Sequence, residues 1–65
     1  MDMRQVDYFL SIARTGSFTA AAEELFVSQS SLSKQIIALE RELVVQLFDR
    51  RKRKVTMTEA GRAFH

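Results

Sequence analysis

Residues 29–44 carry their large apolar side chains along one narrow line of a helix. At 100° per residue, the line occupies an arc of only about 60°. It consists of Leu32, Ile36, Leu39 and Leu43. Ser28, just before the segment, is a residue type that caps helix N-termini. The sequence therefore predicts a helix from Gln29 to about Val44 that buries one face against the rest of a small domain.

The opposite face of this expected helix begins with short polar side chains. Gln29, Ser30 and Ser33 precede Lys34 there, where an ordinary surface helix carries mostly Glu and Lys. Serine is a mediocre helix former, so its use in the opening turns favours close approach to a partner. A simple cap with a solvated polar face remains the alternative if this helix is taken alone.

Two further helices are expected before it. Asp2 and Gln5 form the pattern of a capping box before an amphipathic segment, residues 3–15, and Gly16 gives a typical stop. Ser17 can cap a shorter helix over residues 18–25, which contains three consecutive alanines. The break at residues 26–28 is too short to separate independent helices, so an angled helix pair is predicted.

The C-terminal third predicts a small basic hairpin and the start of another helix. Val45 and Leu47, then Val55 and Met57, mark two short extended segments, joined by five consecutive cations at residues 50–54. Thr58 can cap a fourth helix. The expected fold class is mainly α, a winged helix-turn-helix: a three-helix core, a two-stranded wing, and the beginning of a fourth helix. We assign the winged helix-turn-helix to residues 1–57 and the start of the fourth helix to residues 58–65.

Four phenylalanines are expected to lie in the core rather than to act as stacking platforms for single strands. They are Phe9, Phe18, Phe26 and Phe48.

The residue inventory argues against catalysis and metal binding. The 65 residues include no cysteine, and the one histidine is His65 at the end, so neither a metal cluster nor a base for a nucleophile is expected. The close carboxylate pairs, Glu23 with Glu24 and Glu40 with Glu42, do not face each other on a helix and are interpreted as solvated. No apolar run is long enough for a membrane span, and no signal peptide is expected. A cytoplasmic protein that is not an enzyme, holds no metal and does not enter a membrane is expected.

The charge is unevenly distributed and favours a polyanion as partner. Residues 33–65 hold eight Lys and Arg against four Asp and Glu, whereas residues 1–32 hold two against four. The major groove of duplex DNA admits a helix, where Gln29 can pair with adenine and Lys34 with guanine. The N-termini of the second and third helices can approach phosphates, assisted by Ser17, Thr19, Ser28 and Ser33. The alternative hypothesis is a small helical protein-interaction or dimerisation module, whose binding would depend little on salt.

Several separate motifs resemble the N-terminal domain of LysR-type transcriptional regulators. They are Gly16-Ser-Phe-Thr-Ala-Ala-Ala22, Val27-Ser-Gln-Ser-Ser-Leu-Ser-Lys-Gln-Ile36, Leu39-Glu40, Leu47-Phe48, Arg50 and Thr58-Glu-Ala-Gly61. The resemblance spans nearly the whole chain. It implies a winged helix-turn-helix that binds double-stranded DNA, homodimerisation through the helix beginning at Thr58, and an inducer bound by a separate C-terminal domain, with no cofactor in these residues.

The resemblance also implies roles for individual residues. Recognition-helix contacts fall on Gln29, Ser30, Ser33 and Lys34. Wing contacts fall on Arg50 and on Arg53, which would reach the minor groove. The start of the second helix, Ser17 to Thr19 with Phe18 between them, would lie near phosphate, as would Ser28.

Four positions depart from the pattern of this family. Val44 stands where glycine is usual, and a β-branched residue suits a positive φ poorly, so we expect the helix to run longer or to end without that cap. The wing tip, Arg51–Lys52, replaces a small residue and glycine. Phe26 is bulkier than expected in its turn, which favours partial exposure.

Overall fold

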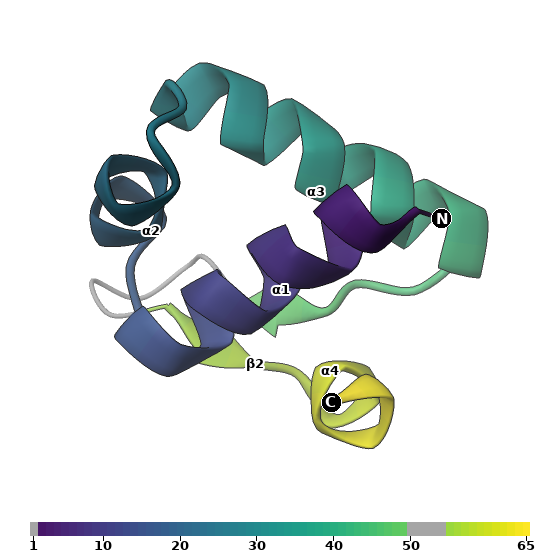
Figure 1. Ribbon diagram of the computed structural model, residues 1–65. Coiled ribbons are helices and arrows are strands. Elements are labelled where there is room, and N and C mark those ends of the chain that lie inside the picture. The colour runs from purple at the N-terminus through teal and green to yellow at the C-terminus, as the bar shows by residue number, and fades with distance from the viewer. Residues whose placement is uncertain (1, 50–54) are drawn as a thin grey trace.

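The computed structural model describes residues 2–49 and 55–65, and its helices pack around one core (Figure 1). In Figure 1, α2 is seen end-on while α3 passes across the top of α1. The elements in chain order are α1 (Met3–Thr15), α2 (Phe18–Leu25), α3 (Gln29–Leu43), β1 (Phe48–Asp49), β2 (Thr56–Met57) and α4 (Glu59–Phe64). The predicted fold class, a mainly helical winged helix-turn-helix, is confirmed.

Each of the four helices begins at the cap that the sequence predicts. Asp2 accepts the N–H of Gln5 at 2.9 Å, within a complete capping box. The hydroxyls of Ser17 and Ser28 accept from the third residue of α2 and α3, at 3.1 and 3.0 Å. Thr58 does the same for α4 at 3.0 Å. These caps satisfy N–H groups that a helix leaves without internal partners.

The end of α3 corrects the expectation for Val44. The helix ends at Leu43, and Val44 takes the left-handed conformation, with φ 59°. Its N–H bonds to the carbonyl of Arg41 at 3.2 Å, and the N–H of Val45 bonds to that of Glu40 at 3.1 Å. This closure satisfies the last carbonyls of the helix, and the side chain of Val44 is 84% exposed, so no packing opposes the turn. Val44 therefore acts as the C-cap of α3 in a backbone conformation that glycine adopts with less strain.

The end of α2 shows that the expectation of a core position for Phe26 was wrong. Phe26 is the C-cap of α2, with φ 59°, and 95% of the residue is exposed. The left-handed backbone directs its ring away from the helix pair. The other three phenylalanines named above are buried, as predicted.

The core forms where the three long helices meet the root of the hairpin. Leu32, Ile36 and Leu39 have no accessible surface, which confirms the apolar stripe of α3, and Leu43 is half-buried. The core residues are Phe9, Ile12, Phe18, Ala21, Ala22, Leu32, Ile36, Leu39, Leu47 and Phe48. The ring of Phe9 lies 5.2 Å from that of Phe48 and 5.0 Å from that of Phe64, so α4 also packs on α1.

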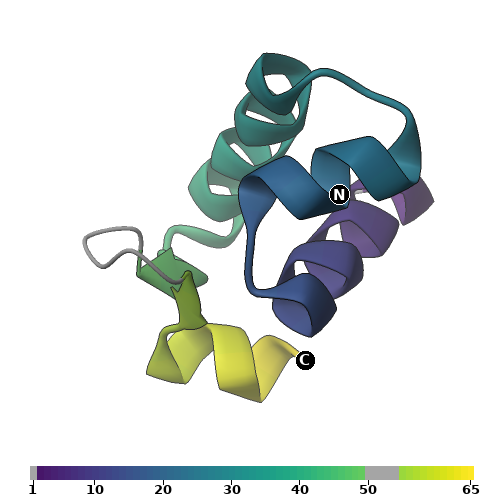
Figure 2. The same ribbon diagram turned by 90° about the vertical axis from the view of Figure 1, so that its left-hand side faces the viewer.

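The hairpin is a two-stranded antiparallel sheet beside this helical layer (Figure 2). Phe48 pairs with Met57, and Asp49 with Thr56. The first strand begins at Phe48, after the segment marked by Val45 and Leu47, and the N–H of Leu47 is bonded to the carboxylate of Glu40. Residues 50–54, with the basic tip, lie outside the described residues. Over the described ranges, none of the helices combines the length and apolar character that crossing a membrane requires.

Candidate nucleic-acid interface

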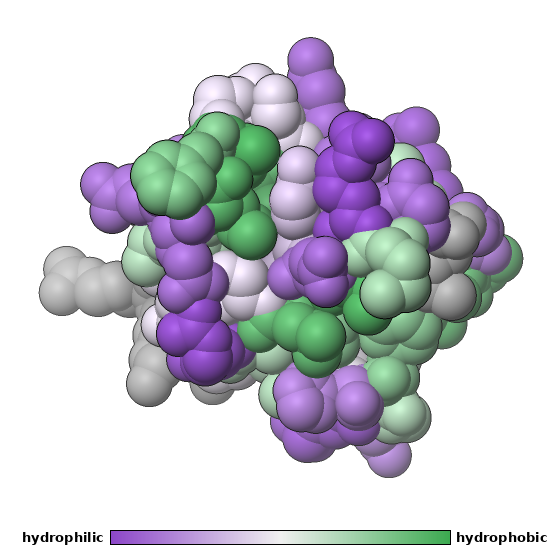
Figure 3. All heavy atoms as spheres, in the orientation of Figure 1, coloured by the Kyte–Doolittle hydropathy of each residue, from purple (hydrophilic) through white to green (hydrophobic). Residues whose placement is uncertain are grey.

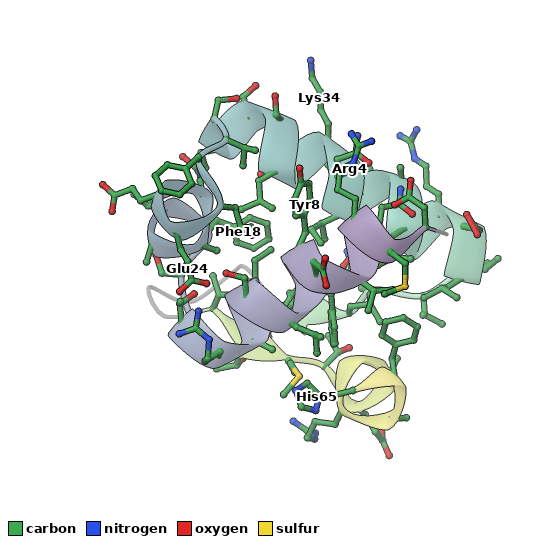
Figure 4. All side chains as sticks on the ribbon, in the orientation of Figure 1. Arg4, Tyr8, Phe18, Glu24, Lys34 and His65 are labelled. Atoms are coloured by element: carbon green, nitrogen blue, oxygen red, sulfur yellow. The ribbon has the colours of Figure 1, made fainter. Side chains whose placement is uncertain are left out.

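The first turns of α3 present polar side chains to solvent. Gln29, Ser30 and Lys34 are exposed and Ser33 is half-buried. Figure 4 shows Lys34 directed away from the body of the domain, whereas Phe18 points into it. In Figure 3, the upper edge over this part of α3 is pale to purple rather than green. The structure thus brings the four predicted recognition residues together on one surface, with the leucine stripe behind them.

The starts of α2 and α3 supply the predicted phosphate-facing residues. Ser28 and Thr19 are exposed and Ser17 is half-buried, with the hydroxyls of both serines serving as caps. Phe18 differs from its neighbours, because its ring lies in the core, 5.9 Å from the ring of Phe48. Of the three residues predicted at this end of α2, Ser17 and Thr19 therefore present side chains to a ligand, whereas Phe18 does not.

The described part of the wing consists of its two strands, β1 and β2. The N–H of Val55 bonds to the carbonyl of Gly16 at 3.3 Å, which ties β2 to the end of α1. The predicted contact residues Arg50 and Arg53 lie outside the described residues, so their roles stay predictions from the sequence.

Sequence reasoning missed two side chains that hold α3 in place. Gln5 donates from Nε2 to Oε1 of Gln35 at 3.2 Å, while its own Oε1 accepts the N–H of Asp2 at 3.3 Å. The interpretation of Glu40 as solvated was wrong: it is 8% exposed, because its Oε2 turns inward and accepts the N–H of Leu47 at 2.8 Å. The capping box indicated Gln5, and the Leu39-Glu40 motif drew attention to Glu40, but neither signal identifies a partner in another element.

Glu24 is exposed, as expected for a solvated carboxylate, and the structure adds two partners that the sequence did not indicate. It forms an ion pair with Arg14 and accepts a hydrogen bond from Ser11 Oγ at 2.6 Å. The hydrogen bonds from Arg14 and Ser11 hold the pKa of the Glu24 carboxyl below its usual range, against a small opposing effect of desolvation. The ion pair links the end of α1 to α2 and is not part of the polar recognition face of α3.

Within residues 2–49 and 55–65, no three side chains of His, Cys, Asp or Glu gather closely enough to hold a metal ion. What the described residues offer is a helix face with hydrogen-bonding groups, set beside two helix N-termini.

Two crossing helices joined by the turn at residues 26–28, with the second presenting a polar face, define a helix-turn-helix DNA-binding domain. The chain belongs to the LysR family of bacterial regulators. The model of that family, described as a bacterial regulatory helix-turn-helix protein, matches residues 3–62.

Curated relatives are similar over almost the whole chain. An uncharacterised regulator of this type from Azotobacter vinelandii is 51% identical over 97% of this chain and 44% of its own length. The regulator TfdT from Cupriavidus pinatubonensis is 44% identical over 98% of this chain and 28% of its own length. The chain thus spans less than half of either relative.

Solved structures share the fold closely. The DNA-binding domain of BenM, in complex with catB site 1 DNA, superposes with a TM-score of 0.96 at 42% identity, covering 98% of this chain and 71% of that one. The corresponding domain of CbnR, also in complex with DNA, gives 0.93 at 44% identity, covering 98% and 74%. These relatives are described as regulators and DNA complexes, and none as a protein-interaction module.

Proposed function

We propose that this chain reads specific sequences in duplex DNA, with α3 in the major groove and residues 50–54 on the backbone and the adjacent minor groove. The observation that carries the proposal is the division of α3 into two faces. Leu32 is completely buried, while Gln29 and Lys34 are exposed on the other side. Such a helix is anchored from behind and leaves its polar N-terminal half available for base edges.

Each side chain on this face suits a definite contact. The amide of Gln29 can pair with N6 and N7 of adenine, and the ammonium of Lys34 can donate to O6 and N7 of guanine. Ser30 and Ser33 are short enough for close approach, and their hydroxyls both donate and accept. Ser17, Thr19 and Ser28 stand where phosphates would meet the N-termini of α2 and α3. Arg50 and Arg53 would add sequence-independent attraction.

The setting of this activity follows from the family. We propose that residues 1–57 are the DNA-binding unit and that residues 58–65 begin a linker helix through which two copies associate. A two-fold dimer would then read two half-sites. An inducer would bind a separate domain, no cofactor would be needed in these residues, and the protein would act on DNA in the cytoplasm. The relatives' roles as regulators support a role in transcription.

Duplex binding is tested by fluorescence anisotropy of a labelled site, selected from random duplexes, across a salt titration. Each phosphate neutralised should lower the logarithm of the association constant by roughly 0.9 per decade of salt. Lys34→Gln is expected to weaken binding. Arg62→Gln removes the same charge from α4, on another face, and is expected to bind nearly as the parent does. A selected pool without any common sequence, or equal losses in the two variants, would contradict the proposal.

A further inference from the structure

The backbone of one residue, Leu47, contacts both α3 and the N-cap of α4. Glu40 Oε2 on α3 accepts the N–H of Leu47 at 2.8 Å and lies 3.4 Å from the N–H of Phe48. The carbonyl of Leu47 accepts the N–H of Thr58, the N-cap of α4, at 2.9 Å. The side chain of Leu47 has no accessible surface. We call Glu40, Leu47, Thr58 and Gly61 the Leu47 junction.

Gly61 allows α4 to lie directly against the carbonyl group of Leu47. A Cβ at this position would stand 3.0 Å from the carbonyl carbon of Leu47 and still closer to its oxygen. Real Cβ atoms essentially never approach so closely, and the obstacle is backbone, which cannot rotate away. The Thr58 hydroxyl adds a bond to the carbonyl of Gln46 at 2.5 Å. The first turn of α4 therefore fits this segment only where residue 61 has no side chain.

A carboxylate as buried as Glu40 is costly unless its hydrogen bonds are made. The hydrogen bonds from the N–H groups of Leu47 and Phe48 offset this cost only while these two residues stay against the Glu40 carboxylate. The same segment bonds to α4 through Gln46 and Leu47. The segment after α3 thus links the orientation of α3 to the direction of α4, in addition to the packing of Phe64 on Phe9.

We propose that the Leu47 junction sets the direction in which α4 leaves the domain relative to α3, with Glu40 and Gly61 as its positioning residues. The consequence for recognition rests on the function proposed above. In a two-fold dimer built on the helix after Thr58, this direction determines how far apart the two α3 helices lie, and hence the half-site separation that can be read.

The junction is tested by spin-label distances, for which the absence of cysteine is an advantage. One pair, Ala38→Cys with Ala63→Cys, joins exposed positions on α3 and α4. A second pair, Ala38→Cys with Asp7→Cys, joins α3 to α1 and serves as the reference. Both are measured in the parent chain and in Gly61→Ala, Glu40→Leu and Glu40→Gln, with circular dichroism confirming that each variant is folded.

We expect Gly61→Ala and Glu40→Leu to shift or broaden the α3–α4 distances while the α1–α3 distances stay as in the parent. Glu40→Gln keeps an oxygen acceptor and should preserve both. If one of the disruptive variants does not fold, the other carries the test. Unchanged α3–α4 distances in a folded Gly61→Ala or Glu40→Leu chain, or equal changes in both pairs, would overturn the proposal.

The distances are measured without DNA, so their outcome does not depend on the proposed function. Binding of the folded Gly61→Ala chain to a single half-site duplex provides the second readout. Its affinity should match that of the parent, because the face of α3 is intact. If the parent itself binds no duplex, the proposed function fails, while the distances still decide on the junction.

Discussion

Ser30 and Leu32 lie on opposite sides of α3: Ser30 is exposed, whereas Leu32 has no accessible surface. One side of the helix can therefore be changed without disturbing the core, and the other cannot. This separation allows DNA recognition and stability to be tested by different substitutions.

Gln29→Ala should relax base preference at one position of the site. Gln29 is exposed, so its loss removes a base contact with little effect on packing. The expected loss on the preferred site is about 1–3 kcal/mol of binding free energy, with little change on a site mutated at that base pair. Anisotropy on both duplexes measures it. Gln46→Ala, an exposed amide outside the recognition face, is the control; an equal loss on both duplexes would contradict a base contact.

Arg53→Gln should weaken binding to all duplexes by similar factors. An arginine that contacts phosphate or a narrow minor groove contributes attraction without reading major-groove bases. The slope of the logarithm of affinity against that of salt should fall by roughly one. A salt titration with specific and scrambled duplexes measures both effects. Loss confined to the specific duplex would show instead that Arg53 reads bases.

Ile36→Ala should lower the free energy of unfolding by about 2–5 kcal/mol, because it leaves a cavity in the core. Ile36 has no accessible surface, whereas Ile37 is 40% exposed. Ile37→Ala is therefore the matched control and should cost much less. Urea unfolding followed by circular dichroism measures both. Equal losses would mean that the buried face of α3 has been misassigned.

Val44→Gly should stabilise the domain by about 0.5–1 kcal/mol. A left-handed conformation costs a residue with a Cβ roughly 1–2 kcal/mol, part of which is offset by the greater freedom of glycine in the unfolded chain. The exposed side chain contributes little packing. Val44→Ala keeps most of the left-handed cost and should gain less. Thermal unfolding compares the three, and a destabilised glycine variant would contradict the cap.

Acid should remove the contribution of Glu24 to stability. Because the pKa of Glu24 is lowered in the folded chain from its ordinary value of 4.5, the contribution is fully present above that value. It is lost as the pH falls through the folded pKa. Unfolding of the parent and of Glu24→Gln, measured from neutral pH downward, should converge at low pH. A constant difference between them would show that Glu24 acts without its charge.

The sequence was sufficient for features that depend on local chemistry. Caps at Asp2, Ser17, Ser28 and Thr58 follow from residue type and position, and the stripe of α3 follows from helical spacing. The polar recognition face could be predicted for the same reason, because it is the complement of that stripe.

Features that depend on distant partners could not be predicted. The bond from Gln5 to Gln35 and the bond from Leu47 to Glu40 join elements whose relative placement no local pattern specifies. The expectation for Val44 was wrong because backbone closure of the helix end outweighed the preference of a β-branched side chain against positive φ. The core position expected for Phe26 was wrong because this residue closes α2 and is exposed.

The insertion of α3 into the major groove is tested most directly by replacing N7 with carbon at single purines of the selected site. This change removes a major-groove acceptor and leaves the minor groove unaltered. The account predicts that one such adenine weakens binding of the parent chain, and that Gln29→Ala is insensitive to the change at that same adenine. Full affinity of the parent chain for every substituted duplex would contradict it.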